Sequence, residues 1–343
     1  MPDVGWGFIG ASTIAREHMV AAVRAQPGHD VVAVASARRE RAEAFAAEHG
    51  IAGAYDSVPA LLADRAVKAV YVSTTNERHC EQVLAAAAAG KHVLCEKPLA
   101  LSVDDAQRMV AACRDAGVVM ATNHHLRNAA THRKLRELVA QGAIGRPLYA
   151  RVFHAVHLRP LVQGWRIDRP QAGGGAILDI VVHDADVLRF IFQAEPVRAL
   201  AMCQSGVMAR EGIEDGAMAV FELDNGVLAQ VHAAFTVPHA GTGIEIHGDR
   251  GSLIGRGVMT AHPVGDVLLR DAQGEHVVPV VHENLYAGGV ARFSEAMRGA
   301  GRPAATGEDG VRSLAAALAV AEACRTGASA PAGVRARPLS DAA

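Results

Sequence analysis

The sequence predicts an α/β protein in which an N-terminal doubly wound parallel sheet precedes a second domain with an open, mostly antiparallel sheet. From residue 4 to about residue 123, short apolar runs alternate with segments of helical period, which is typical of β-α-β units. After residue 124, alternating strands separated by turn signals replace that repeat. We therefore expect a first domain over residues 1–123, a second over 124–326 and a loose tail over 327–343.

The first domain is expected to contain five strands. They are near-continuous apolar runs, as in a sheet that is buried on both faces, and they cover residues 4–9, 30–36, 69–74, 92–97 and 118–123. The helical segments between them end on glycine, as a helix C-cap does, and they cover residues 40–50, 79–90 and 102–117. This order predicts a parallel sheet.

The second domain is expected to begin with a helix over 129–142, a strand over 147–158 and a helix over 175–192. Six alternating strands should follow, at residues 198–207, 216–224, 226–235, 243–249, 251–255 and 266–271. Turn signals such as "DNG" and "GDRG" favour antiparallel pairing. Two helices, at about 285–299 and 306–325, close the fold.

The composition excludes several classes of protein. Half of the 343 residues are apolar and the formal net charge is −2, so no basic surface for a nucleic acid and no membrane span is expected. The N-terminus lacks the pattern of a secretory leader. The five cysteines are odd in number and lack C-x-x-C spacing, which predicts reduced buried thiols and neither a disulfide nor a zinc framework. We expect a cytoplasmic protein, with its oligomeric state left open.

The first strand leads into a glycine-rich turn. Gly5, Gly7 and Gly10 match G-x-G-x-x-G as text, but the residues between them look like the strand itself. Shifted by five, the spacing becomes G-x-S-x-x-A on Gly10, Ser12 and Ala15, at the start of a helix. Such a turn lets backbone N–H groups meet a pyrophosphate. The alternative is an ordinary strand-to-helix turn.

The second strand ends without the acidic residue that would bind the ribose hydroxyls of NAD. Ser36 stands there, and Arg38, Arg39 and Arg41 follow closely. Guanidinium groups match phosphate oxygens, so this segment favours the 2′-phosphate of NADP. The alternative is a basic first turn of a solvated helix.

Three side chains could carry acid–base chemistry. Lys97 follows the fourth strand, at the ligand crevice of a doubly wound sheet, although it could also be a surface lysine. Asp179 and His183 are four apart on an apolar helix, so we expect the carboxylate to orient the imidazole and raise its pKa. The alternatives are a helix-dipole role for Asp179 and a core position for His183. No metal is expected, because further ligands at convincing spacing are lacking.

The motifs G-x-S-x-x-A, "STTNERH", "GKHVLCEKPLA", "TNHHLRN", "GWR" and "GGGAILDIVVHDAD" together resemble the glucose-fructose oxidoreductase and inositol dehydrogenase (Gfo/Idh/MocA) family over about residues 4–326. The resemblance implies a Rossmann domain, NADPH between the domains, and Lys97, Asp179 and His183 as the catalytic set. It also implies cofactor contacts from Gly10, Ala11, Ser12, Thr13, Ile14 and Ala15 at the pyrophosphate; from Ser36, Ala37, Arg38 and Arg41 at the adenosine phosphate; and from Thr74, Thr75, Asn76, His79, Glu96, Lys97, Asn123, Trp165, Arg166 and Tyr286 along the nicotinamide and its ribose.

The activity that the resemblance implies is NADPH-dependent reduction of a cyclic sugar ketone, with 1,5-anhydro-D-fructose giving 1,5-anhydro-D-mannitol. A polar pocket should surround the carbonyl, and some of its candidate side chains should instead face solvent or the core; the candidates are His124, His125, Arg127, His154 and His157. Trp165 either stacks on a ligand ring or anchors its loop.

Two other functions stay open. One is an oxidative NAD(P)-dependent sugar or inositol dehydrogenase. The absence of an acidic residue at Ser36 disfavours an NAD-linked enzyme of this kind. The other is an NADP-binding sensor without turnover, which the intact trio of Lys97, Asp179 and His183 disfavours.

Overall fold

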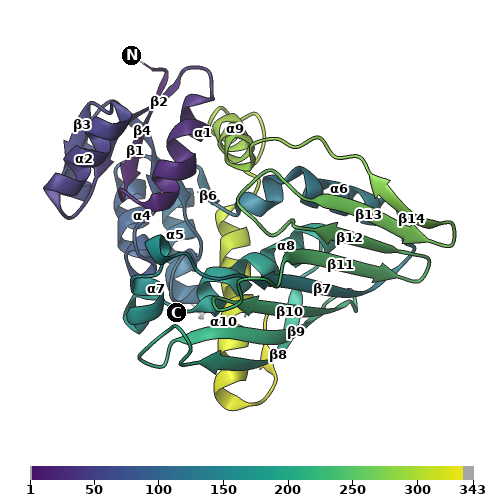
Figure 1. The fold of residues 1–343 in the computed structure, drawn as a ribbon. Coiled ribbons are helices and arrows are strands. Elements are labelled where there is room, and N and C mark those ends of the chain that lie inside the picture. The colour runs from purple at the N-terminus through teal and green to yellow at the C-terminus, as the bar shows by residue number, and fades with distance from the viewer. Residues whose placement is uncertain (1, 335–343) are drawn as a thin grey trace, which may run out of the picture.

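Six parallel strands form the first sheet in the order β3-β2-β1-β4-β5-β6 (Figure 1). The computed structural model describes residues 2–334. The strand order changes direction between β1 and β4, which is where open α/β sheets bind ligands, beyond the carboxyl ends of the strands. The six strands are β1 Val4–Ile9, β2 His29–Ala35, β3 Gly53–Tyr55, β4 Val67–Val72, β5 His92–Cys95 and β6 Met120–Thr122.

Helices cover both faces of this sheet because its side chains alternate between two apolar cores. Trp6 and Phe8 of β1 face a core shared with α1, α2 and α9, whereas Ile9 faces one shared with α3, α4, α5 and α10. These helices are α1 Val20–Arg24, preceded by a π-helical turn Ala15–Met19, α2 Arg39–His49, α3 Val58–Ala63, α4 His79–Ala88, α5 Val103–Asp115, α9 Leu285–Met297 and α10 Gly307–Thr326.

The second sheet has nine strands in the order β14-β13-β12-β11-β7-β10-β9-β8-β15. Its neighbours are antiparallel except β7 and β10, which are parallel. The strands are β7 Pro147–Ala155, β8 Pro196–Ser205, β9 Glu214–Leu223, β10 Leu228–Ala234, β11 Thr242–Gly248, β12 Ser252–Arg256, β13 Asp266–Asp271, β14 Gly274–Val278 and β15 Ala330–Pro331.

One face of this sheet packs on helices, and the other is open. Helices α6 Ala130–Ala140, α8 Val182–Phe192 and α10 contribute to the buried core, while α7 Trp165–Asp168 lies in the loop before α8. Leu200, Met202 and Met218 stay exposed on the opposite face. The predicted fold class is therefore confirmed. No helix within residues 2–334 is long and apolar enough to cross a membrane.

Three short segments differ from the expectation. Strands β3 and β14 and helix α3 were not expected from the sequence. Part of the expected loose tail is ordered, because β15 pairs with β8 and both Ala330 and Ala332 are buried. The rest of that tail, residues 335–343, lies outside the described residues. How the chain divides into domains stays a prediction, and α9, from the expected second domain, packs against the first sheet.

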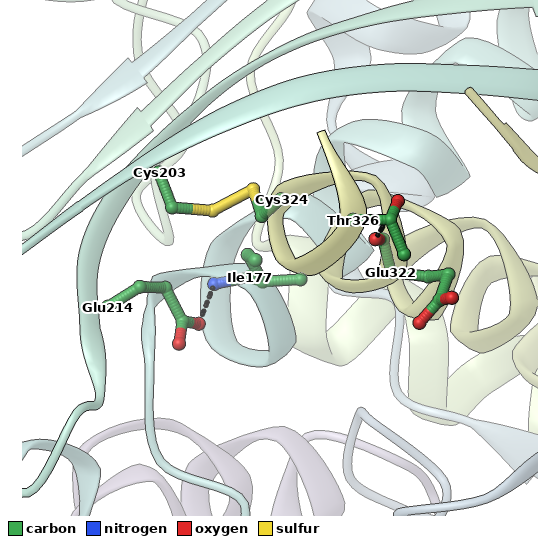
Figure 2. The surroundings of a disulfide bond; sticks show 6 residues. All are labelled: Ile177, Cys203, Glu214, Glu322, Cys324 and Thr326. Atoms are coloured by element: carbon green, nitrogen blue, oxygen red, sulfur yellow. Dashed lines mark hydrogen bonds between the residues drawn. A yellow bond between two sulfur atoms is a disulfide. The ribbon is translucent and has the colours of Figure 1, made fainter. Parts of the chain in front are cut away.

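Two cysteines form a disulfide, so the expectation of five reduced thiols is wrong (Figure 2). Cys203 on β8 bonds to Cys324 on α10, with the Cα atoms 5.7 Å apart and a sequence separation of 121. The fold brings strand and helix side by side, which the cysteine spacing does not encode. Cys80, Cys95 and Cys113 are free thiols, and the last two are buried as expected.

Candidate active site

Lys97 and Asp179 form a close ion pair where the first sheet meets α8. Lys97 lies just beyond the carboxyl end of β5, and its Nζ donates to Asp179 Oδ1 at 2.7 Å and to the Asp179 backbone oxygen at 2.8 Å. Arg166 Nε donates to the other carboxylate oxygen at 3.2 Å. Burial alone would raise the pKa of Asp179, but Lys97 and Arg166 hold it well below its ordinary value. The carboxylate is therefore ionised at neutral pH.

The predicted contact between Asp179 and His183 does not form. Asp179 lies on a π-helical turn, Ile177–Val181, that precedes α8, whereas His183 lies on the first α-helical turn. The wider π turn removes the regular i,i+4 alignment, and the carboxylate turns to Lys97 and Arg166. The expectation that Asp179 orients His183 and raises its pKa is therefore wrong: burial, and then the Lys97 charge, lower the pKa of His183 well below its usual value.

His183 has a buried ring nitrogen that no other described residue satisfies. Its Nδ1 has no hydrogen-bond partner within residues 2–334. Three further imidazoles surround the ring, with centroids 5.0 Å away for His125, 5.9 Å for His124 and 6.2 Å for His154. A buried polar atom without a partner is costly, so a ligand that supplies one would be favoured here.

The polar residues expected around the carbonyl divide into two groups. His125, His154 and His183 gather together, and His154 Nδ1 lies 2.8 Å from the buried Asp184 carboxylate. The other three candidates are bonded within the chain or exposed, although the His124 ring also lies beside His183. His124 Nε2 lies 2.8 Å from Ser313 Oγ, Arg127 forms a two-bond ion pair with Asp186, and His157 is exposed.

The glycine turn has the shape that a pyrophosphate requires. Gly5 and Gly7 lie inside β1, so the later G-x-S-x-x-A spacing is confirmed as the one at the turn. Gly10 has φ +111°, and a Cβ there would lie 2.9 Å from the Ser73 carbonyl oxygen. Ser12 Oγ accepts from the Ala15 N–H at 3.1 Å and donates to Ser73 Oγ at 2.9 Å. Thr13 and Ile14 lie between these anchors, directly before the π turn.

A cavity of about 420 Å³ opens beyond the carboxyl ends of β1, β2 and β4. Ser36, Ala37 and Thr74 are among the side chains that line it. Arg41 extends over the glycine turn and donates to the Ala11 carbonyl oxygen at 2.8 Å, and Arg38 is exposed at the start of α2. Arg39 instead pairs with Glu43 at 2.8 Å. The turn and the cavity together fit an adenosine-containing dinucleotide, with Arg38 and Arg41 available to a phosphate.

Glu96 and Asn123 form a buried polar group at the other end of this edge. Glu96 Oε1 accepts from both Tyr71 Oη and Asn123 Nδ2 at 2.6 Å. Burial raises the pKa of Glu96, although these two hydrogen bonds oppose the shift. Tyr286 lies close by, and its hydroxyl has no partner among residues 2–334. These groups could meet the nicotinamide half of a dinucleotide.

Several predicted cofactor contacts form hydrogen bonds within the chain. His79 is fully buried, with its ring nitrogens 2.9 Å from the Pro98 carbonyl oxygen and 3.3 Å from that of Thr74. Asn76 Nδ2 donates to the Gly173 carbonyl oxygen, and Thr75 Oγ1 donates to Glu77. These residues hold the loop after β4 in place. That they also contact the cofactor stays a prediction.

Trp165 and Arg166 are in contact, as their adjacency in the sequence suggested. The Arg166 guanidinium lies 4.5 Å from the centre of the Trp165 ring. Arg166 Nη1 donates to the Val162 carbonyl oxygen at 3.0 Å. Arg166 therefore ties this loop together, and stacking of Trp165 on a ligand ring stays a prediction. Arg166 also reaches Asp179, so the loop is tied to the Lys97 centre.

Sequence reasoning missed an ion pair between the two halves of the molecule. Arg159, in the loop after β7, donates to both carboxylate oxygens of Glu17 on the π turn Ala15–Met19, at 3.4 and 3.0 Å. It also missed Tyr71, whose hydroxyl holds Glu96. A tyrosine in an otherwise aliphatic strand is a signal that could have been noted, whereas the Glu17–Arg159 contact joins segments too distant for any local pattern.

Comparison with known proteins adds independent information. A family model described as "Oxidoreductase family, NAD-binding Rossmann fold" matches residues 4–124, and one described as "GFO/IDH/MocA C-terminal domain" matches residues 132–254. The 1,5-anhydro-D-fructose reductase of Ensifer adhaerens is 58% identical over 94% of this chain and 96% of its own length. D-Xylose 1-dehydrogenase (NADP(+)) 2 of Haloferax volcanii is 30% identical over 94% and 98%.

Solved structures show the same fold. The aldose-aldose oxidoreductase of Caulobacter crescentus, determined with glycerol, aligns with a TM-score of 0.88 over 96% of this chain and 99% of that protein. Its sequence identity is 23%, so this likeness speaks to fold alone.

Proposed function

The chain belongs to the GFO/IDH/MocA family of oxidoreductases, and on that premise we propose that it uses NADPH to reduce a cyclic sugar ketone, 1,5-anhydro-D-fructose, to 1,5-anhydro-D-mannitol. The observation that carries the proposal is the partly buried Lys97–Asp179 pair, 2.7 Å apart, beside the unpartnered Nδ1 of His183. The 58% identity to a reductase of that name supports the choice of substrate.

In this proposal, Lys97 and His183 act on the substrate oxygen. The nicotinamide, when bound, supplies the hydride to the carbonyl carbon. The Lys97 ammonium polarises the carbonyl and stabilises the developing alkoxide, and the ionised Asp179 keeps that ammonium in place. His183 is neutral, so a ring N–H can donate a hydrogen bond to the same oxygen. The alkoxide would take its proton from the Lys97 ammonium, either directly or through His183, whose other ring nitrogen gains a proton as the first releases one.

The cofactor in this proposal is NADPH. Gly10, Ser12 and Ala15 would hold the pyrophosphate. Position 10 of this turn requires glycine, because a side chain there would clash with the Ser73 backbone. Ser36, with Arg38 and Arg41 nearby, would bind the 2′-phosphate. Glu96 and Asn123, with the Tyr286 hydroxyl, would lie along the nicotinamide ribose.

The direct test is reduction of defined carbonyl compounds by the purified protein. We expect NADPH oxidation with 1,5-anhydro-D-fructose to be far faster than with simple aliphatic ketones, because a pocket with several polar groups rejects a substrate that leaves them unpaired. NMR of the product identifies the new stereocentre. Reduction of NADP⁺ by glucose, xylose or myo-inositol, without activity on any ketose, would instead establish the oxidative alternative that the relationship to a xylose dehydrogenase also allows.

A further inference from the structure

His125 lies between the catalytic helix and the start of α9. It is the first residue of a 3-10 turn, His125–Asn128, that follows β6. Its ring is 5.0 Å from the His183 ring, centre to centre, at an interplanar angle of 75°. It is also stacked on Tyr286, at 4.9 Å and 17°. His125 therefore contacts the imidazole that the proposed function assigns to the substrate oxygen.

The two adjacent histidines of this segment have different roles. His124 is 2% exposed and bonds through Nε2 to Ser313 on α10, so it is part of the protein interior. His125 is partly exposed and lies on the side of His183. Of these two histidines, only His125 therefore has exposed surface that a ligand beside His183 can reach.

Tyr286 joins His125 to the first helix. Its ring stacks on His125 and also on His18, whose centroid is 4.5 Å away at 16°. His18 belongs to the π turn Ala15–Met19, and Tyr286 to the first turn of α9. Aromatic contacts of this kind fix the plane of a ring. Segments from three distant parts of the sequence thus define how the His125 imidazole is oriented.

The chemistry of His125 matches a hydroxyl group. Burial, followed by the nearby Lys97 charge, lowers the pKa of His125 well below its usual value, so the ring is neutral. A neutral imidazole offers one N–H donor and one nitrogen acceptor, and a sugar hydroxyl offers the same two functions. Because the His125 and His183 rings are in contact, the ligand atoms that they bind lie close together, as oxygens on adjacent carbon atoms do.

We propose that His125 binds the substrate hydroxyl on the carbon next to the reacting carbonyl, and that Tyr286 and His18 are positioning residues that hold its ring beside His183. The inference rests on the proposed function and extends it. It assigns the preference for a ketone flanked by a hydroxyl to a side chain outside the Lys97, Asp179 and His183 set.

The test compares two ketones on two variants. 1,5-Anhydro-D-fructose carries the neighbouring hydroxyl, whereas tetrahydropyran-3-one keeps the ring ketone and has no hydroxyl. The substitution His125→Phe keeps a stacking ring and removes both nitrogens. At saturating NADPH we expect kcat/KM for the sugar to fall roughly 10- to 100-fold, mostly through KM, and kcat/KM for tetrahydropyran-3-one to change less than about threefold. His125→Asn, which restores a donor and an acceptor, should recover part of the loss.

The positioning role is tested at Tyr286. Tyr286→Phe keeps the stacked ring, so the ratio of kcat/KM between the two ketones should remain near that of the wild type. Tyr286→Leu removes the ring and should lower this ratio towards that of His125→Phe. Because both ketones are measured at saturating NADPH, altered cofactor affinity does not change the ratio. His276→Ala, on β14 and 52% exposed, is the control.

The outcomes separate the two claims. If the wild type prefers the sugar and His125→Phe has the same preference, the role of His125 is overturned and the proposed function stands. If Tyr286→Leu behaves as Tyr286→Phe, the positioning role is overturned. If the wild type oxidises NADPH with neither ketone, the proposed function itself fails.

Discussion

The edge of the first sheet and the surroundings of α8 differ in whether their polar side chains have hydrogen-bond partners. Near the glycine turn, side chains bond to the chain itself: Ser12 to the Ala15 amide and Asn76 to the Gly173 carbonyl. Around α8, buried atoms such as His183 Nδ1 and Asp184 Oδ2 have no partner within residues 2–334. The first region is thus a preformed backbone frame, whereas the second keeps side-chain groups that a ligand can satisfy. Substitutions in the first should affect cofactor affinity, and in the second turnover.

The largest effect is expected from Lys97→Ala, on the α8 side. It removes the ammonium that lies 2.7 Å from Asp179 and, in the proposed mechanism, stabilises the alkoxide. We expect kcat to fall about 1,000-fold or more, with the dissociation constant for NADPH changing much less. Stopped-flow reduction and NADPH fluorescence titration measure the two quantities. Lys68→Ala, at an exposed position of β4, is the control. A loss confined to NADPH affinity would contradict the assignment.

His183→Asn should have the next largest effect. Asparagine retains a hydrogen-bond donor but cannot exchange a proton near neutral pH, so kcat should fall by roughly 100- to 10,000-fold. The variant should still bind NADPH, as shown by fluorescence. Near-complete activity in this variant would remove the proton-transfer role of His183. His239→Asn, in an exposed loop, controls for the loss of a histidine.

Ser36→Asp tests the edge of the first sheet, where the cofactor is expected to bind. Ser36 lines the cavity beyond β2, and an aspartate there would repel a 2′-phosphate and accept hydrogen bonds from ribose hydroxyls. We expect kcat/KM with NADPH to fall about 10- to 100-fold while kcat/KM with NADH rises. The corresponding expectation for the wild type is a clear preference for NADPH. Equal kcat/KM for the two cofactors in the wild type would refute the NADPH assignment.

Cys203→Ser should have the smallest effect on turnover. The disulfide joins β8 to α10 and encloses a long loop, so its loss should lower the free energy of unfolding by about 2–4 kcal/mol. Neither cysteine contacts the residues assigned to chemistry, so kcat/KM should remain unchanged. Denaturant unfolding with and without reductant measures the effect. Cys203→Ser should be insensitive to reductant, whereas Cys80→Ser, at a free thiol, keeps the disulfide and should lose stability on reduction as the wild type does.

The sequence predicted the first sheet well because its rules are local. Each apolar run becomes a strand, and in a parallel sheet the carboxyl ends meet at one edge, so Gly10, Ser36 and Lys97 could be placed together without coordinates. The short strand β3 and helix α3 were missed because three to six residues carry too little periodicity. Both pack on neighbours that supply most of their stabilisation.

The α8 side was predicted less completely because its contacts are not local. The spacing of Asp179 and His183 indicated an i,i+4 pair, but the π turn and the competing charges of Lys97 and Arg166 separated them. The direction in which His124 and His125 point depends on Ser313 and Tyr286, from the far end of the chain. The Cys203–Cys324 bond was missed for the same reason.

The packing of α9 on the first sheet also constrains how the protein is made. Trp6 of β1 and Phe293 of α9 are 5.4 Å apart, although they lie near opposite ends of the described chain. A ribosome adding 5–20 residues per second needs roughly 15–60 seconds to release Phe293 after Trp6. Throughout that interval the apolar face of β1 lacks its final covering helix. The first sheet therefore reaches its final packing only after α9, in the last third of the chain, has been synthesised.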